Sequence, residues 1–183
     1  MEPRAFLERI DAGRVVLRKH QVEQAEEMFS VVDGDRERLR RFLPWVDSLR
    51  GVEDERKYLE MTDREWAKSS LFDFGMHRRD GAYLGNIGVH SIAWPHGRCG
   101  LGYWIAGQFE GQGYVTEAVA ALEKACFELG FFRVEIRCSS LNERSAAVPK
   151  RLGYRHEGTL RQEAVDHRGQ RRDTFIFAKL RGE

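Results

Sequence analysis

A strong helical pattern between two strand patterns constrains the fold of this chain more than any other feature. Val115 to Leu129 repeats apolar residues on one helical face and is followed by Gly130, a residue that commonly ends helices. Strand patterns precede this helix at 100–105 and follow it at 132–138, where apolar and charged residues alternate. A strand, a helix and a strand in succession predict a crossover with parallel pairing of the two strands.

The segments before this unit predict an antiparallel meander. Phe72, Phe74 and Met76 alternate with other residues, as in a strand, and Asp80-Gly81 is a typical hairpin turn. The remaining patterns predict a short strand at 15–17, helices at about 21–43 (broken at 33–35), 54–69 and 142–152, and strands at about 83–91, 158–165 and 174–180. We therefore expect one α+β domain over residues 1–183, with a mostly antiparallel sheet of six or seven strands and four or five flanking helices.

Composition places the chain among ordinary globular proteins and gives no sign of a nucleic-acid or membrane partner. Of 183 residues, 42% are hydrophobic and 32% charged, and 30 basic residues nearly balance 29 acidic ones. No apolar run reaches the length of a membrane span, and the first ten residues are too charged for a signal peptide. Cys99, Cys126 and Cys138 lie in apolar stretches without C-x-x-C spacing, which is typical of reduced, partly buried thiols in a cytoplasmic protein.

The segment from Gln108 to Thr116 carries the most chemical information. It joins a strand to the strong helix, and Gly111 and Gly113 allow backbone N–H groups to approach a ligand closely. The first turn of the helix adds unpaired N–H groups and the positive end of the helix dipole. A P-loop would need Gly-Lys-Ser/Thr, and a dinucleotide fingerprint would need glycine or alanine in place of Thr116. The pattern favours a pyrophosphate-binding loop, and the alternative is a glycine-rich connection that binds nothing.

Several segments together resemble the GNAT superfamily of N-acetyltransferases. The acetyl-CoA motif of that superfamily is similar to Gln108-x-x-Gly111-x-Gly113, with Gly102-Tyr103-Trp104-Ile105 before it. Its second signature resembles Asn142–Ser145, Lys150–Tyr154 and Glu157–Arg161, and the subgroup of bacterial ribosomal-protein alanine and serine N-terminal acetyltransferases has a segment similar to Arg41–Asp47. The resemblance covers about residues 12–180 in the correct order. It implies a GNAT-like sheet whose central strands are splayed apart.

The resemblance implies acetyl-CoA as a co-substrate and assigns residues to it. The backbone of Tyr103, Trp104 and Ile105 would pair with the pantetheine arm, as an added strand does. The pyrophosphate would be held along the loop and the start of the helix, by Gln108, Phe109, Gly111, Gln112, Gly113, Tyr114, Val115 and Thr116, the last also through its hydroxyl.

The short helix at about 142–152 supplies further candidates. Asn142 would contact the coenzyme arm, and it is equally a good N-cap residue. Lys150 and Arg151 would meet the 3′-phosphate or form a solvated helix end. Ser145 matches by position the superfamily's proposed acid for the departing thiolate, although a serine in a first helical turn is commonly a cap. Pro149 has no N–H for the Ser145 carbonyl four residues earlier, so we expect that carbonyl to bond another donor.

The sequence leaves the general base open. Relatives have a glutamate on the strand after the second signature, and its position falls on Ala164, one residue beyond Glu163. Because strand side chains alternate between faces, Glu163 would point away from the site unless a bulge restores it. Asp166 shares the face of position 164 and is the second candidate, and a water relay is the third.

The resemblance implies direct transfer of acetyl to a primary amine in a ternary complex. The leading acceptor is the N-terminal α-amine of a protein such as a ribosomal protein, and Phe42 and Trp45 would line the acceptor wall or pack in the core. His90 would reach the acceptor side or be a hydrogen-bonded core histidine. A polyamine or aminoglycoside-like amine is the alternative acceptor, and a non-catalytic acyl-CoA-binding module is the rival of a different class. The histidines show no metal-ligand spacing, so we expect no metal, and pairing into a homodimer is left open.

Overall fold

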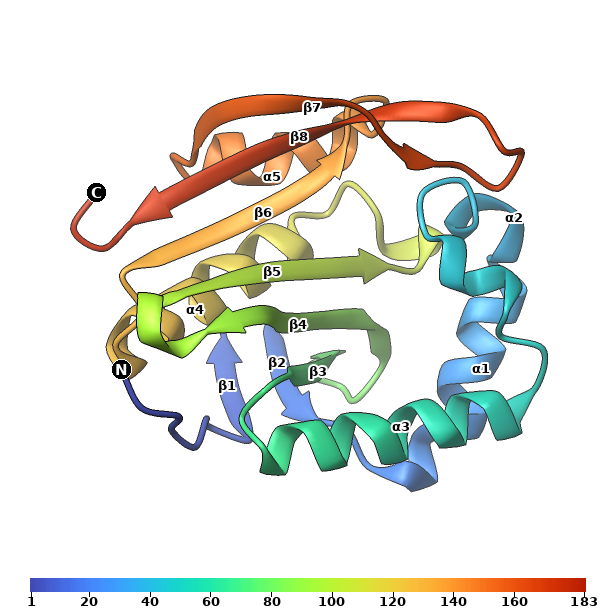
Figure 1. Cartoon of the computed structure of the whole chain (residues 1–183). Helices are drawn as coiled ribbons and strands as arrows, with labels where there is room; N and C mark the ends of the chain where they lie inside the picture. The colour runs from blue at the N-terminus through green and yellow to red at the C-terminus, as the bar shows by residue number, and fades with distance from the viewer.

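Eight strands form one mixed sheet in the computed structural model, which describes residues 1–183 (Figure 1). They are β1 (Arg9–Ala12), β2 (Val15–Lys19), β3 (Phe72–Arg78), β4 (Tyr83–Ala93), β5 (Arg98–Ile105), β6 (Arg133–Ser139), β7 (Arg155–Val165) and β8 (Arg171–Leu180). Their order is β1-β2-β3-β4-β5-β6-β8-β7, and all neighbours are antiparallel except β5 and β6. The α+β class, the meander of β3 to β5 and the parallel crossover are therefore confirmed.

Five α-helices accompany the sheet: α1 (Ala25–Gly34), α2 (Arg36–Leu39), α3 (Val52–Ala67), α4 (Tyr114–Leu129) and α5 (Glu143–Arg151). Short 3-10 turns lie at Val22–Gln24, Pro44–Asp47, Trp94–His96 and Gly107–Phe109. The predicted break of the first helical segment lies between α1 and α2, and α4 ends at Gly130 in a left-handed conformation, as its sequence indicates. None of these helices has both the length and the apolar character that crossing a membrane requires.

The prediction of six or seven strands is wrong because it misses β1. This strand has four residues, of which Ile10 and Ala12 are buried while Arg9 and Asp11 are exposed. A tight turn joins it to β2, and Gly13 in that turn has a φ of +75°. Alternation over four residues, half of them charged, is too short a pattern to distinguish a strand from a turn.

β5 and β6 separate at the centre of the sheet. Their pairing covers only Arg98–Leu101 against Arg133–Ile136, whereas β5 continues to Ile105 and β6 to Ser139. Figure 1 shows the two arrows diverging beyond the paired part. The second half of β5 therefore has only β4 as a strand neighbour, and the expected splay of the central strands is confirmed.

The two faces of the sheet carry different helices. α4 packs on β1, β2, β5 and β6, and α5 packs on β6, β7 and β8. The largest apolar cluster lies on this side, and Tyr103 and Ile105 pack against it. Trp104, which lies between them in the strand, packs instead against apolar residues of α1, α2 and α3. Residues of β5 therefore meet the α4 side and the α1–α3 side alternately.

A buried polar cluster lies between the sheet and α3. Asp73 of β3 accepts hydrogen bonds from the Tyr58 hydroxyl at 2.8 Å and from Asn86 Nδ2 at 3.2 Å. Glu55 of α3 is only 4% exposed. Burial raises the pKa of Glu55 to about 7, with the charge of Asp73 adding to the effect and that of His20 opposing it. The folded protein therefore keeps a proton on Glu55 at pH values where an ordinary carboxyl has lost it.

We expect the protein to lose stability between about pH 4.5 and pH 7 because of Glu55. Above the ordinary pKa of 4.5, the unfolded chain binds fewer protons at this position than the folded protein. The free energy of unfolding therefore falls as the pH rises, by roughly 3 kcal/mol at most. It levels off above about pH 7, where Glu55 is ionised in both states. Urea unfolding at pH 5 and pH 8 measures the loss. Glu55→Gln should remove most of it and the exposed control Glu53→Gln should not, whereas an unchanged loss in Glu55→Gln would contradict this explanation.

Candidate active site

A cleft of about 870 Å³ opens where β5 and β6 separate. Its walls come from the end of β5, the loop before α4, the first turns of α4 and α5, and the segment of α2 with the residues after it. The N-terminal ends of two helices face the same space, at Val115 of α4 and Ser145 of α5. The dipoles of both helices and the free first-turn N–H groups of α4 make this cleft suited to a negatively charged ligand.

The loop between β5 and α4 presents a row of free backbone donors. The N–H groups of residues 111–116 have no acceptor within the protein. Gly113 is the N-cap residue of α4, so the first-turn N–H groups that follow it have no carbonyl before them. Gly111 and Gly113 have φ angles of +74° and +85°, which glycine adopts without strain. Such a row is suited to the oxygens of a diphosphate.

The row of free donors is shorter than the predicted one, which began at Gln108. The N–H groups of Phe109 and Glu110 donate within the preceding turn, and Phe109 lines the cleft with its side chain instead. Gln108 and Gln112 do not line the cleft, and Gln112 Nε2 donates to the Gln108 carbonyl at 3.0 Å. The two glutamines therefore hold the shape of the loop.

Arg14, in the turn between β1 and β2, supports the same loop. Its Nη2 donates to the Gln112 carbonyl at 2.8 Å, and its Nε donates to Glu117 Oε1 at 2.7 Å. The hydrogen bond from Arg14 lowers the pKa of Glu117, which lies in the first turn of α4. Glu117 thus stays ionised and holds Arg14 against the loop.

The backbone of β5 at the splay is directed alternately to β4 and to the gap. The Ala106 N–H donates to a carbonyl of β4, and the Trp104 carbonyl lies against Gly85 of β4. Tyr103 and Ile105 alternate with these residues, so their backbone N–H and C=O groups point into the gap. Of the three residues expected to pair with a coenzyme arm, Tyr103 and Ile105 have the required direction, and the backbone of Trp104 is directed to β4, although Trp104 also lines the cleft.

Ser145 faces the cleft from the first turn of α5 and is bonded to Tyr103. The Tyr103 hydroxyl donates to the Ser145 carbonyl at 2.9 Å, and the Ser145 hydroxyl lies 3.4 Å from the Tyr103 oxygen, to which it donates. Pro149 leaves this carbonyl without its helical partner, so the expectation of another donor is confirmed. Burial raises the pKa of Tyr103, an effect that the Ser145 bond only partly offsets, and the phenol stays a neutral donor.

Asn142 takes the capping role that Ser145 could have had. Its Oδ1 accepts the Ser145 N–H at 3.1 Å, which confirms Asn142 as the N-cap of α5. Both residues line the cleft. The Ser145 hydroxyl is therefore not needed to cap the helix and is available for chemistry.

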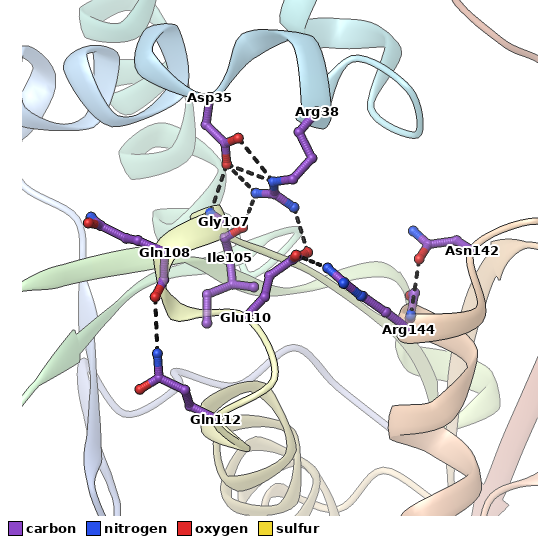
Figure 2. Close-up of polar contacts among 10 residues, drawn as sticks. Asp35, Arg38, Ile105, Gly107, Gln108, Glu110, Gln112, Asn142 and Arg144 are labelled. Atoms are coloured by element: carbon purple, nitrogen blue, oxygen red, sulfur yellow. Dashed lines mark hydrogen bonds and ion pairs between the residues drawn. The ribbon is translucent and has the colours of Figure 1, made fainter.

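A set of ion pairs at the end of β5 was not predicted from the sequence (Figure 2). Arg38 of α2 donates to the Ile105 carbonyl at 2.6 Å and to Glu110 Oε1 at 2.6 Å, and it pairs with Asp35. Asp35 Oδ2 also accepts the Gly107 N–H at 2.8 Å. The only sequence signal was the i, i+3 spacing of Asp35 and Arg38, which many surface helices share.

Glu110 extends this set to the opposite wall of the cleft. Its second carboxylate oxygen pairs with Arg144 at the start of α5, and Figure 2 shows the two side chains meeting between the loop and that helix. The Arg144 side chain is 76% exposed and lines the cleft. Arg144 is therefore an exposed cation beside the row of free N–H groups, paired with Glu110.

Residues 14–155 match a family model described as "Acetyltransferase (GNAT) domain". The chain belongs to the GNAT acetyltransferase family. It is an N-acetyltransferase that uses acetyl-CoA as the acetyl donor. The family assignment agrees with the sheet order, the splay and the free N–H groups of the loop.

This GNAT acetyltransferase is similar to two acetyltransferases whose names refer to ribosomal proteins and to one named for self-immunity to microcin C7. The "Putative ribosomal N-acetyltransferase YdaF" of Bacillus subtilis (strain 168) is 28% identical over 172 residues, which cover 92% of each chain. The solved structure of RimL, the ribosomal L7/L12 alpha-N-protein acetyltransferase with coenzyme A, has a TM-score of 0.90 at 21% identity and covers 94% of this chain and 98% of that one. The microcin C7 self-immunity acetyltransferase MccE, solved with acetyl-CoA and AMP, has a TM-score of 0.87 at 21% identity, covering 91% and 92%.

Neither candidate base of this GNAT acetyltransferase lines the cleft. β7 does contain an irregularity: its register against β8 shifts between Leu160 and Ala164, and Gln162 has a φ of +52°. Glu163 accepts a hydrogen bond from the Thr174 hydroxyl at 2.8 Å. Asp166 accepts two backbone N–H groups of the β7–β8 turn, and the bonds from Gln170 first of all lower its pKa. Asp166 is therefore a structural residue of the turn, while Glu163 lies beside β8, which is separated from the splay by β6.

Of the residues predicted to bind the acceptor or the 3′-phosphate, the cleft includes only some. Phe42 lines the cleft. Trp45 does not line it, is 41% exposed, and has its ring centroid 6.2 Å from that of Trp104. His90 lies in a separate cavity of about 140 Å³ at the paired end of β5 and β6, and burial lowers its pKa. Lys150 is exposed and does not line the cleft.

No group of three or more His, Cys, Asp or Glu side chains is arranged to hold a metal ion.

Proposed function

We propose that this enzyme acetylates the N-terminal α-amine of a protein, with a ribosomal protein as the first candidate. The row of free N–H groups at 111–116 beside Ser145 is the observation that carries the proposal, because it orients a donor's diphosphate at one end of the cleft. The likeness to YdaF over 92% of both chains supports the ribosomal acceptor. The apolar wall formed by the last residue of α2, Leu39, and by Phe42 and Leu43 after it is suited to the first side chains of a peptide.

The donor's phosphates and its arm have separate partners in this proposal. The N–H groups of residues 111–116 bind the diphosphate, and the hydroxyl of Thr116 lies in the same wall. The gap-facing backbone of Tyr103 pairs with the pantetheine arm as a strand would, whereas Arg38 holds the Ile105 carbonyl and leaves the Ile105 N–H for the thioester oxygen. Arg144 and Arg151 line the cleft where Lys150 does not, so we assign the 3′-phosphate to these arginines.

Bound acetyl-CoA supplies an activated acetyl thioester, and the protein must supply three groups for aminolysis. A base takes the proton of the incoming ammonium, and Glu163 acting through water is our candidate, since its carboxylate lies beside Thr174 and outside the cleft. The gap-facing N–H of Ile105 donates to the oxygen on which negative charge develops. The Ser145 hydroxyl exchanges its long 3.4 Å bond to the Tyr103 oxygen for a hydrogen bond to the leaving sulfur. A thiol pKa of about 8.5 makes a thiolate a good leaving group once it is hydrogen-bonded.

A panel of acceptors tests the proposed function. Purified protein and acetyl-CoA are incubated with peptides that carry N-terminal sequences of ribosomal proteins, including those beginning with alanine and serine. The same peptides with a blocked N-terminus but free lysines are the matched controls, and mass spectrometry locates the acetyl group. We expect acetylation of the free α-amine only. Faster turnover of spermidine or an aminoglycoside than of every peptide would favour a small-amine acceptor and overturn the proposal.

A further inference from the structure

The last residues of β5 need an anchor that the sheet does not provide. After Leu101 this strand has β4 on one side and no strand on the other. A strand end with one neighbour opens readily. Here two backbone groups on the open side are held by side chains of α2 and the residue before it: the Ile105 carbonyl by Arg38 and the Gly107 N–H by Asp35.

The same guanidinium reaches both sides of the cleft. Arg38 Nε donates to both Asp35 oxygens at 3.0 and 2.9 Å, while its other nitrogens hold Ile105 and Glu110. Leu39, which follows Arg38 directly, lines the acceptor wall. The planar fork of an arginine therefore sets the distance between the acceptor wall and the strand that carries the donor.

The backbone at Gly107 is tightly packed against the Arg38 and Asp35 side chains. A Cβ at Gly107 would lie 2.9 Å from Arg38 Nε and 3.3 Å from Asp35 Oδ2. The Arg38, Asp35 and Glu110 side chains are only 31%, 22% and 20% exposed, so the set is not a loose surface ion pair of small effect.

We propose that Arg38, held by Asp35, is a positioning residue for acetyl transfer, which fixes Ile105 of β5 relative to the acceptor wall. The proposal rests on the placement of the donor along β5 in the proposed function. Arg38 touches neither the acetyl donor's thioester nor the acceptor amine, and it acts by aligning the two groups. Misplacement by about 1 Å costs an enzyme up to 100-fold in rate, so loss of this residue should affect turnover more than affinity.

The chain contains a matched control two residues earlier. Arg36 pairs with Asp33 at the same i, i+3 spacing and donates to the Val46 and Leu49 carbonyls at 2.5 and 2.8 Å. Arg36 is 25% exposed, close to the value for Arg38, and does not line the cleft. Replacing either arginine removes a guanidinium and its bonds to the backbone, but only Arg38 is joined to β5.

The test compares Arg38→Met with Arg36→Met, using whichever amine the wild-type enzyme acetylates fastest. For Arg38→Met we expect kcat to fall at least tenfold, with the Kd for coenzyme A within about threefold of wild type by calorimetry. For Arg36→Met we expect kcat within about twofold. Arg38→Lys should stay impaired, because one ammonium cannot reach all three acceptors. Equal kcat values for the two methionine variants, or a loss in Kd that matches the loss in kcat, would overturn the proposal.

Two further measurements keep the test decisive. If Arg38→Met does not fold, Asp35→Asn replaces it, since the amide oxygen still accepts the Gly107 N–H while the charge that holds Arg38 is lost. Hydrogen exchange with coenzyme A bound needs no acceptor amine. Faster exchange at residues 103–107 in the Arg38 variant than in Arg36→Met supports the proposal, and equal exchange contradicts it. A failure of every peptide in the acceptor panel would refute the N-terminal acceptor and leave this comparison intact.

Discussion

Ser145→Ala is expected to lower kcat about 100-fold or more while coenzyme A binds as tightly as to the wild type. In the proposed mechanism this change removes the donor to the leaving sulfur and leaves untouched the free N–H groups of residues 111–116, to which we assign the diphosphate. The helix should lose little, because Asn142 caps α5 and alanine is a good helix former. Steady-state kinetics with calorimetry for coenzyme A measure both quantities.

Ser140→Ala is the control for this prediction. Ser140 lies in the turn between β6 and α5 and does not line the cleft, so its loss should leave kcat unchanged. Normal coenzyme binding together with an unchanged rate in Ser145→Ala would show that the leaving thiolate needs no donor from this residue.

Gly113→Val is expected to weaken coenzyme A binding by about 100-fold or more. Gly113 has a φ of +85°, which costs a side-chain-bearing residue roughly 1–2 kcal/mol, and more for a β-branched one. A Cβ at this position would also lie 3.2 Å from Arg14 Nη2. The loop should relax to a different backbone conformation, and the N–H groups of residues 111–116 would no longer point to one ligand. Calorimetry or a thermal-shift titration with coenzyme A measures the change.

Gly169→Val is the control for backbone strain. Gly169 has a φ of +77° in the β7–β8 turn, and a Cβ there would meet nothing within 4 Å. The two variants therefore carry similar strain, but only one alters the loop. Tight coenzyme binding by Gly113→Val, or an equal loss in both variants, would contradict the assignment of residues 111–116.

Local patterns predicted most of the fold. The helix from Tyr114 to Leu129 and the parallel pair β5 and β6 follow from periodicity and from the order of elements. The strand β1 was not predicted, because alternation over four residues is too short to indicate a strand. The irregularity of β7 also has no sequence mark, since Gln162 is not a residue type that commonly adopts a positive φ.

In the candidate site, too, local features could be predicted from the sequence and contacts between distant residues could not. The loop with Gly111 and Gly113 is a local feature, and its free N–H groups follow from the start of a helix. The contacts of Arg38 with Glu110 and Ile105 join residues 72 and 67 positions apart, and only the folded chain brings them together. The role of Glu163 stays a prediction, because its position depends on the irregular part of β7.

The interruption of the sheet has a consequence for the lifetime of the enzyme. Between β5 and β6 only four residue pairs join the two halves of the sheet. With the donor in the gap, as we propose, its backbone contacts would stabilise the folded state, by about 2.7 kcal/mol when the donor concentration is 100 times Kd. Resistance to heat and to proteases should therefore follow the supply of acetyl-CoA. In a cell that is short of acetyl-CoA, the amount of enzyme should therefore fall together with its activity.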